Sequence, residues 1–339
     1  GQSVNMLNFI SKSNISIGFR GSRATTFLYL RHQIENFVLL KIAFHNAYIH
    51  PLREGHRFPM LKYELIPMQL IHEGLVSKDS FFEPELVSEE IACLAHDESY
   101  VRDLFELTLD ARMIRRIGFP LTDSLIRRER LIVDGTIRTA LFAIQYGIAF
   151  NVAGGTHHAG YAYGEGFCLL NDQAIAAAYL LAEQKAHKIL IIDLDVHQGN
   201  GTANIFKGSK AVFTFSMHGA KNFPFIKEQS HLDISLEDGI TDKNYLSQLT
   251  TVLPDLFEKV APDFVFYQAG VDVLATDKLG KLKLSPEACK ERDYIVLSLC
   301  RQLDIPVQVS MGGGYSEHIR DIVNAHIQTY RTAIELYNF

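Results

Sequence analysis

The chain is organised around one stretch, Ile189-Leu190-Ile191-Ile192-Asp193-Leu194-Asp195-Val196-His197-Gln198-Gly199-Asn200-Gly201. Its four consecutive aliphatic residues predict a strand that is buried on both faces of a parallel sheet. Polar residues then occupy every second position, and an extended backbone would point Asp193, Asp195 and His197 to the same side. A buried carboxylate is costly unless it is paired or binds a metal ion, and two carboxylates with one imidazole suit Zn²⁺, Fe²⁺ or Mn²⁺. The stretch therefore predicts a metal site at the end of a buried strand.

Composition and charge narrow the class of protein. The 339 residues are 47% hydrophobic and 21% charged, which is typical of a globular protein with a large core in one or two α/β domains. The formal net charge of -6 argues against an extended nucleic-acid surface, although a positively charged substrate is compatible with it. The cysteines form no C-x-x-C pair, which favours a reducing compartment, and no apolar run reaches the ~18 residues of a membrane span. We therefore expect a cytoplasmic protein with no direct nucleic-acid partner and no membrane span.

The first 34 residues differ in composition from the rest of the chain. They contain four basic residues, several Ser and Thr, and no acidic residue. This is the composition of an organelle transit peptide, and a cloning remnant followed by an irregular extension is the alternative. We expect residues 1–40 to be an N-terminal extension and residues 41–339 to be the folded domain. The location would be organellar if the first segment is a transit peptide.

Four further strands are predicted to end in a polar signal, as the strand at residue 189 does. They cover residues 148–152, 212–217, 262–270 and 305–311, and they lead to His157 and His158, His218, Asp272 and Tyr315 respectively. Sites in open parallel α/β sheets form at the carboxyl ends of the strands. We therefore expect these five strand ends to converge on one site.

The remaining segments predict the elements that surround the sheet. Residues 41–45 predict a first strand, and helical patterns cover residues 61–73, 84–96, 99–114, 136–146, 171–184 and 317–337. Residues 115–130 are charged and contain Pro120, which indicates an exposed helix–loop segment. Asn171 or Asp172 caps an Ala-rich helix that leads into the strand at residue 189, which is a βαβ unit.

The strand-end residues predict hydrolytic chemistry. Asp195, His197 and Asp272 provide three protein ligands and leave a position for water or substrate, as in catalytic and not structural zinc sites. A metal held there can polarise a carbonyl group and lower the pKa of bound water to about 7.

Three further kinds of residue complete this chemistry. His157 and His158 are candidates for general base and general acid, and Asp193 for a carboxylate that orients a histidine. The hydroxyl of Tyr315, behind three glycines, is a candidate donor to an oxyanion, so the set describes hydrolysis of an amide or ester. The aromatic side chains of the flanking loops are candidate walls of an apolar channel, and core packing is the alternative: they are Phe167 and Phe223.

Four separated motifs resemble the zinc-dependent histone deacetylase family. They are GGTHHAGYAYGEGFCLLND at 154–172, IIDLDVHQGNGT at 191–202, AGVD at 269–272 and GGGY at 312–315. They occur in the order of that family, and the resemblance covers the chain from about residue 41 to its end. The Gln-Gly-Asn after His197 and the HP…GHRFPM stretch near residues 50–60 look most like the class IV branch and its bacterial relatives.

The resemblance implies a fold and an activity. The fold is the α/β arginase/deacetylase fold, in which helices flank a central parallel sheet of eight strands. The activity is hydrolysis of an acetyl or longer acyl group from the amine of acyl-lysine, at the end of a narrow tunnel in the deacetylase-like domain. The implied cofactor is Zn²⁺, with Fe²⁺ as the alternative and K⁺ as a further ion.

The resemblance also implies a role for individual residues. It implies that the metal ligands are Asp195, His197 and Asp272. It implies that the catalytic set is His157, His158, Tyr315, Asp193 and Asn200, in which His158 accepts the proton and Asp193 orients His157. It implies that the tunnel wall contains Gly166, Phe167, Phe223 and Gly314. It implies that the inner monovalent-cation site is formed around Asp193, Asp195, His197, Ser216 and Met217.

Two departures from the family pattern affect these expectations. Many members carry Asp at the position of Asn200, and an amide stabilises an imidazolium less than a carboxylate does. We therefore expect the pKa of His158 to be lower here, and activity to persist to mildly lower pH than in an Asn200→Asp variant. The acidic residue with which some members grip the substrate backbone at the tunnel rim has no identifiable counterpart, so the substrate range stays open.

Three alternatives remain at the level of sequence. A two-metal ureohydrolase of the arginase type would need further carboxylates, but Gly199 follows the ligand His197 by two positions and Val271 and Val273 flank Asp272. A deacetylase of acetylpolyamines or of small-molecule amides would use the same chemistry. A catalytically silent module that binds acyl-lysine would not need Tyr315 and a complete ligand set.

Overall fold

A single parallel sheet forms the centre of the molecule in the computed structural model, which describes residues 39–339. In this part of the chain the sheet has eight strands in the order β2-β1-β3-β8-β7-β4-β5-β6, and all neighbouring pairs are parallel. The strands are β1 (Lys41–Ala43), β2 (Phe81–Phe82), β3 (Ile148–Asn151), β4 (Ile189–Asp193), β5 (Val212–Gly219), β6 (Leu232–Leu236), β7 (Phe264–Gln268) and β8 (Val307–Ser310). The predicted eight-stranded α/β sheet is confirmed.

The five strands with polar signals are consecutive neighbours in the middle of this sheet, in the order β3-β8-β7-β4-β5. Every residue of β3, β4, β7 and β8 is buried, as expected for central strands with near-continuous apolar sequences. Asp193 at the end of β4 pairs in register with Gln268 of β7 and Ser216 of β5. The loops that follow these strands therefore leave the sheet side by side.

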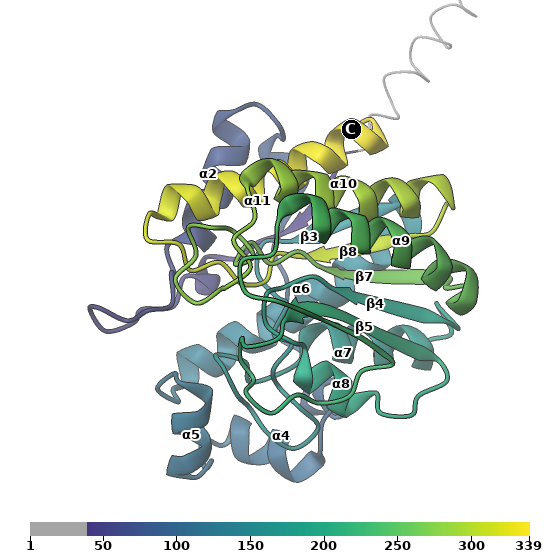
Figure 1. Cartoon of the computed structure of the whole chain (residues 1–339). Helices are drawn as coiled ribbons and strands as arrows, with labels where there is room; N and C mark the ends of the chain where they lie inside the picture. The colour runs from purple at the N-terminus through teal and green to yellow at the C-terminus, as the bar shows by residue number, and fades with distance from the viewer. Residues whose placement is uncertain (1–38) are drawn as a thin grey trace, which may run out of the picture. The chain divides into compact units, whose positions relative to one another are not determined.

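Helices cover both faces of the sheet (Figure 1). One face carries α2 (Lys62–His72), α9 (Asp242–Val260), α10 (Pro286–Gln302) and α11 (Ile319–Tyr337), and the other carries α6 (Asp123–Tyr146), α7 (Asp172–Ala182) and α8 (Asn200–Ile205). The shorter helices are α3 (Glu89–Ala92), α4 (Glu98–Phe105), α5 (Ala111–Ile117) and the 3₁₀ turns η1 (Asn46–Tyr48) and η2 (Lys78–Ser80). Asn171 caps α7 by accepting a hydrogen bond from the Ala174 N–H, as the sequence predicts.

The prediction of an exposed helix–loop segment at residues 115–130 is wrong in its second half. Helix α6 starts at Asp123 and includes the segment 136–146 that the sequence assigns to a separate helix. Arg128 is 2% exposed because its charge is paired with the neighbouring Glu129 and its Nε donates to the Tyr48 carbonyl at 2.9 Å. A charged residue is buried where partners compensate its desolvation, and composition alone does not reveal such partners.

Two other helices are shorter than predicted. The segment 84–96 contains only the single turn α3, which starts after Ser88, and the predicted helix at 99–114 is divided into α4 and α5. Leu107 adopts a left-handed φ of 62° between the two, and the side chain of Asp110 accepts N–H bonds that start α5. A local cap has therefore overridden a continuous helical pattern. The strands β2 and β6 and the helices α9 and α10 are additional elements that the sequence pattern did not assign.

No helix within residues 39–339 combines the length and apolarity needed to cross a membrane. The four cysteines all lie in this range and none forms a disulfide. Residues 1–38 of the expected N-terminal extension 1–40, with its transit-peptide and cloning-remnant alternatives, lie outside the described residues, and Leu40 is already part of the core.

Candidate active site

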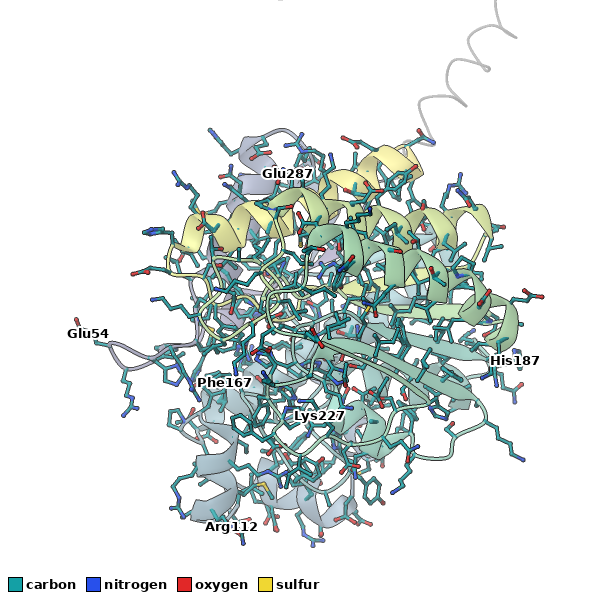
Figure 2. The ribbon with its side chains drawn as sticks, viewed as in Figure 1. Glu54, Arg112, Phe167, His187, Lys227 and Glu287 are labelled. Carbon is teal, nitrogen blue, oxygen red and sulfur yellow. The ribbon has the colours of Figure 1, made fainter. Side chains whose placement is uncertain are left out.

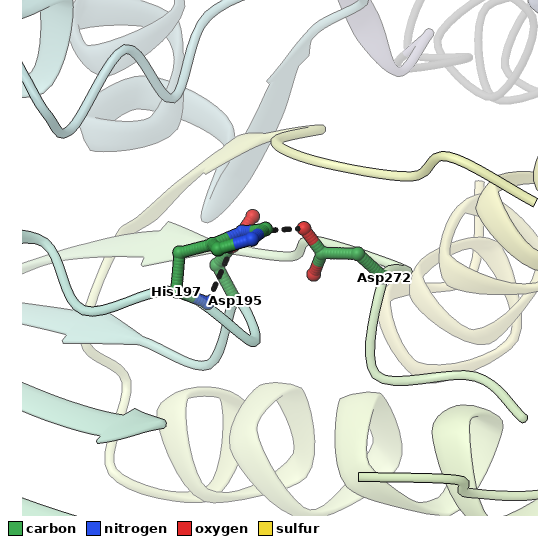
Figure 3. Close-up of side chains that lie close together, drawn as sticks. All are labelled: Asp195, His197 and Asp272. Atoms are coloured by element: carbon green, nitrogen blue, oxygen red, sulfur yellow. Dashed lines mark hydrogen bonds and ion pairs between the residues drawn. The ribbon is translucent and has the colours of Figure 1, made fainter. Parts of the chain in front are cut away.

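The three predicted ligands lie together at the carboxyl ends of two adjacent strands. Asp195 and His197 follow β4, and Asp272 follows β7. One potential ligand atom from each lies within 4.8 Å of the others, and all three residues are buried. Figure 3 shows the imidazole of His197 between the two carboxylates, where Nδ1 is 3.0 Å from Asp195 Oδ1 and 3.1 Å from Asp272 Oδ2. The strand itself ends at Asp193, so Asp195 and His197 are directed by the turn that follows it and not by strand alternation.

Backbone amides hold the two ligand carboxylates in position. Asp195 Oδ2 accepts the Gly313 N–H at 2.8 Å, and Asp272 Oδ1 accepts the Val196 N–H at 2.9 Å. A Cβ atom at position 313 would lie 2.0 Å from Asp272 Oδ2, so only glycine allows the loop after β8 to approach the ligands this closely. Backbone contacts within the fold therefore orient both carboxylates.

The electrostatics of this cluster favour a cation. Burial opposes a charge on His197, but hydrogen bonds and charges from Asp195 and Asp272 outweigh it and raise the pKa of His197 to about 10. Burial and the charge of Asp195 raise the pKa of Asp272 to about 7. Two oxygen donors and one nitrogen donor around a site that stabilises positive charge fit a divalent ion such as Zn²⁺ or Fe²⁺.

The two adjacent histidines have different partners. His157 Nδ1 lies 2.7 Å from Asp193 Oδ2, and His158 Nδ1 lies 2.7 Å from Asn200 Oδ1. Burial lowers the tendency of His157 to carry charge, but Asp193 and Asp195 outweigh it, so the pKa of His157 is raised. Burial and the charges of His157 and His197 lower the pKa of His158 well below its usual value. The pair therefore combines a histidine that favours the protonated form with one that stays neutral.

Tyr315 reaches the same place from β8. Its N–H donates to Asp277 Oδ2 at 2.6 Å, and its ring centroid lies 6.2 Å from that of His197. Burial and the charges of Asp272 and Asp195 raise the pKa of Tyr315 well above its usual value, so the hydroxyl stays protonated and can donate a hydrogen bond. The sequence pattern did not identify Asp277, because its role depends on a contact across 38 residues.

Two cavities meet at these residues. An inner cavity of about 40 Å³ and an outer one of about 520 Å³ share a common set of lining residues: His158, Gly166, Phe167, His197 and Tyr315. Phe223 lines the outer cavity, and its ring lies 4.9 Å from that of His158. Gly314 lines neither cavity, and a Cβ atom at this position would point at Val271. Its neighbours Gly312 and Gly313 line the inner cavity.

An aromatic side chain that the sequence did not single out completes the wall. Phe58 lines the inner cavity, and its ring lies 5.3 Å from Phe167 and 6.1 Å from Tyr315. The sequence signal that could have indicated Phe58 as a wall residue is its position in the GHRFPM stretch, which contains Gly and Pro. Behind it, Lys62 is buried and donates from Nζ to the Gly312 carbonyl at 2.6 Å, and burial lowers its pKa to about 8.

His218 is the one strand-end signal that does not lead to the cavities. It lies inside β5, not at its end, and is fully buried between Ser216 Oγ at 3.0 Å and Ser235 Oγ at 3.3 Å. The expectation that it converges on the site is therefore wrong, and its role is that of a hydrogen-bonded core residue. Ser216 and Met217 lie on β5, beside the end of β4 that carries Asp193.

Comparisons with known proteins find similar sequences and a similar structure. The sequence profile of the histone deacetylase domain matches residues 56–330. An uncharacterised protein of Picosynechococcus sp. is 43% identical over 296 residues, which cover 87% of this chain and 99% of that protein. Histone deacetylase 2 of Arabidopsis thaliana is 28% identical over 282 residues, 80% of this chain and 73% of that protein.

More distant similarities extend to an animal protein and to a solved structure. Histone deacetylase 1 of Homo sapiens is 27% identical over 305 residues, and the match spans 61% of its length. The crystal structure of the HDA15 HD domain superposes with a TM-score of 0.69 at 21% identity and covers 88% of this chain and 95% of that one. At this identity the superposition supports the fold.

Proposed function

Because the chain belongs to the histone deacetylase family, we propose that it is a metal-dependent hydrolase that removes acetyl or longer acyl groups from the amine of acyl-lysine. The observation that carries the proposal is the buried cluster Asp195, His197 and Asp272. Two of its members, Asp195 and His197, line the same inner cavity as His158 and Tyr315. Together these five residues would provide the metal ligands, the proton acceptor and the oxyanion donor that amide hydrolysis needs.

Asp195, His197 and Asp272 would hold the metal ion, with Zn²⁺ and Fe²⁺ as the candidates. When bound, such an ion supplies Lewis-acid polarisation of the carbonyl group and a more acidic water molecule. The described residues contain one such ligand group, which supports a mononuclear site over the two-metal arginase alternative. The neighbourhood of Asp193 and Ser216 would provide the proposed K⁺ site.

The side chains around the cluster would perform the proton transfers. His158 is neutral and shares its Nδ1 proton with Asn200, so its Nε2 is free to accept a proton from the attacking water. His157 is held by Asp193 in a form that favours positive charge, which stabilises the transition state and supplies a proton for the leaving amine. Tyr315 donates its hydroxyl proton in a hydrogen bond to the carbonyl oxygen as negative charge develops there.

The tunnel wall would select and shield the substrate. Phe167 and Phe223 present apolar surfaces beside the histidine pair, where they would contact the alkyl stem of lysine and exclude bulk water. The small inner cavity beyond them would receive the acyl group. Its volume of about 40 Å³ favours acetyl over long acyl chains.

The test is a panel of lysine peptides that carry acyl groups from acetyl to myristoyl. We expect turnover that requires metal, is restored to stripped protein by Zn²⁺ or Fe²⁺, and is strongly reduced in Tyr315→Phe. Metal-loaded protein that turns over no acyl peptide would overturn the proposal and favour either small-molecule amides or a silent binding module.

A further inference from the structure

The mouth of the outer cavity is strongly basic. Five Arg and Lys side chains line it, against a single carboxylate, Glu165. The basic residues, which we call the basic mouth, are Arg57, Arg115, Arg116, Lys221 and Lys281. The mouth therefore carries an excess of four positive charges, although the whole chain has a formal net charge of -6.

Much of this charge is uncompensated. Arg116 is paired with Glu165 at 2.8 Å, and Lys221 lies 3.7 Å from Asp238 in an exposed pair. Arg57, Arg115 and Lys281 are exposed and have no carboxylate within 4.0 Å among residues 39–339. Exposed pairs contribute little, so the mouth presents its positive potential to an approaching molecule.

The charges surround the tunnel entrance from several directions. The guanidinium of Arg57 lies 5.2 Å from the ring centroid of Phe167, which forms the tunnel wall. Arg115 and Arg116 come from α5, and Lys281 from the loop before α10. Figure 2 shows Phe167 on the same side of the molecule as the loop that carries Glu54 and the helix that carries Arg112. A substrate that reaches His158 through the outer cavity passes these cations.

The size of the outer cavity indicates which part of the substrate would contact these cations. Its volume of about 520 Å³ is that of a site for a drug-sized ligand, far more than the inner cavity of about 40 Å³. An acylated lysine amide is neutral and would occupy the tunnel. The residues on either side of that lysine would lie in the outer cavity, within reach of the basic mouth.

We propose that the substrate is an acyl-lysine flanked by acidic residues, held by its carboxylates at the basic mouth. This inference rests on the proposed deacylase function and names its substrate class. Complementary charge accelerates encounter, and like charge excludes wrong partners. A basic, histone-tail-like sequence or an acetylated polyamine would be repelled from the same entrance.

The experiment compares acetyl-lysine peptides of one length in which the flanking positions are all Glu, all Gln or all Lys, with N8-acetylspermidine as a fourth substrate. We expect kcat/KM to fall in the order Glu, Gln, Lys, with the polyamine lowest and about tenfold or more between the Glu and Lys peptides, mainly through KM. The variant Arg57→Glu/Arg115→Glu/Lys281→Glu should reverse this order.

The matched control is Lys185→Glu/Lys207→Glu/Lys243→Glu, which changes the net charge equally at exposed positions outside both cavities. It should leave the order unchanged. Turnover of the Gln peptide with no preference for Glu, or with a preference for Lys or polyamine, would overturn this inference and leave the deacylase function intact. No turnover of any peptide would contradict the deacylase function itself. A second variant, Arg115→Glu/Lys281→Glu, tests the same order with the Arg57–Phe167 contact preserved.

An independent observation concerns the one carboxylate at the mouth. Asn200 Nδ2 donates to Glu165 Oε2 at 3.0 Å while its Oδ1 faces His158 Nδ1, and Arg116 Nε donates to Glu165 Oε1 at 2.8 Å. An ionised carboxylate only accepts hydrogen bonds, so the NH₂ group of Asn200 must point to Glu165 and its oxygen to His158. His158 must then donate from Nδ1, which leaves Nε2 unprotonated.

We infer that Glu165 is a positioning residue that sets the tautomer of His158 through the amide of Asn200. An amide alone has two orientations, and the second would offer His158 an N–H and favour the wrong tautomer. The carboxylate of Glu165 excludes that orientation. The role of Glu165 in this chain of contacts also rests on the proposed function of His158.

The test exchanges the carboxylate and the amide between positions 165 and 200. It is measured with the Gln peptide, so that charges on the residues that flank the acyl-lysine do not contribute. Glu165→Gln should lower kcat about tenfold with little change in KM, because its amide permits both orientations of Asn200. Asn200→Asp should also be impaired, because it places two carboxylates against each other. Glu165→Gln/Asn200→Asp should restore kcat to within about threefold of wild type. Wild-type kcat in Glu165→Gln, or a double variant no better than the singles, would overturn the inference.

Discussion

The floor of the cavity and its basic mouth differ in charge, burial and relation to the sequence. The floor consists of two carboxylates and an imidazole that are almost completely buried, and it stabilises positive charge. The basic mouth consists of exposed cations from several separate segments, and it attracts negative charge. Under the proposed function, the floor would perform the reaction and the basic mouth would select the substrate. Changes at the floor should abolish turnover of every substrate, and changes at the exposed cations Arg57, Arg115 and Lys281 should reorder substrates.

The largest effect is expected at the floor. Asp272→Asn removes the charge of a proposed ligand, and with it several kcal/mol of charge stabilisation that a bound metal would provide, which corresponds to at least about a 10³-fold loss of kcat/KM. The loss should be equal for the Glu, Gln and Lys peptides. Metal content per chain, measured on the purified variant, should fall in parallel. A variant that loses turnover of one peptide but retains another would break the division between floor and mouth.

The next effect concerns the scaffold beneath the floor. Arg292 is fully buried beside Asp293, and it donates from Nη1 to the carbonyls of Gly270 and Leu194, which join the ligand-bearing loops of β7 and β4. Arg292→Ala leaves Asp293 buried without its charged partner, although the hydroxyls of Tyr267 and Thr329 still donate to it, so the free energy of unfolding should fall by about 3 kcal/mol. Denaturant unfolding measures this directly. The exposed Arg115→Ala at the mouth is the control and should change stability by less than about 0.5 kcal/mol.

Tyr315→Phe should lower kcat by about 10²–10³-fold with little change in KM, because the hydroxyl contributes mainly when negative charge develops on the carbonyl oxygen. Steady-state kinetics on the Gln peptide separates the two constants. A change confined to KM would show that the hydroxyl binds the substrate instead, and would assign Tyr315 to substrate choice.

The acidic limb of the pH–rate profile should depend on the partner of His158. In wild type the pKa of His158 is lowered, so the base stays neutral and activity persists as the pH falls. In Glu165→Gln/Asn200→Asp a carboxylate stabilises the imidazolium and raises that pKa, so the limb should move up by about one unit. The profile of kcat/KM from pH 5 to 8 measures the shift. An unmoved limb would contradict the assignment of His158 as the base.

The smallest effect is expected from salt at the mouth. The Debye length falls from ~30 Å at 0.01 M to ~10 Å at 0.1 M ionic strength, which weakens attraction between exposed charges. The kcat/KM for the Glu peptide should fall a few-fold over this range, and that for the Gln peptide should not change. Equal salt effects on both would indicate that the basic mouth does not contact the flanking residues.

The local sequence patterns predict the central strands and most residues of the candidate site. The aliphatic run before Asp193 predicts a buried central strand, and the polar residues after β3, β4, β7 and β8 are recognisable because a core does not bury such groups without a purpose. The resemblance of four motifs added the eight-stranded sheet, which the structure confirms, and the roles of the site residues, which remain predictions. His218 shows the limit of this reasoning. A histidine that belongs to a site at a strand end and a buried histidine whose ring nitrogens are hydrogen-bonded in the core have the same sequence pattern.

The tertiary structure decided what depends on partners distant in the chain. Strand order brings Asp195 and Asp272 together across 77 positions, Asp277 orients Tyr315, and Glu129 permits the burial of Arg128. The basic mouth is likewise invisible in a chain of net charge -6, because its cations are scattered among acidic residues until folding gathers them. The sequence by itself determines which residues are costly to bury. Only the folded arrangement determines which charges face one another, since electrostatic energy depends on distance in space and not along the chain.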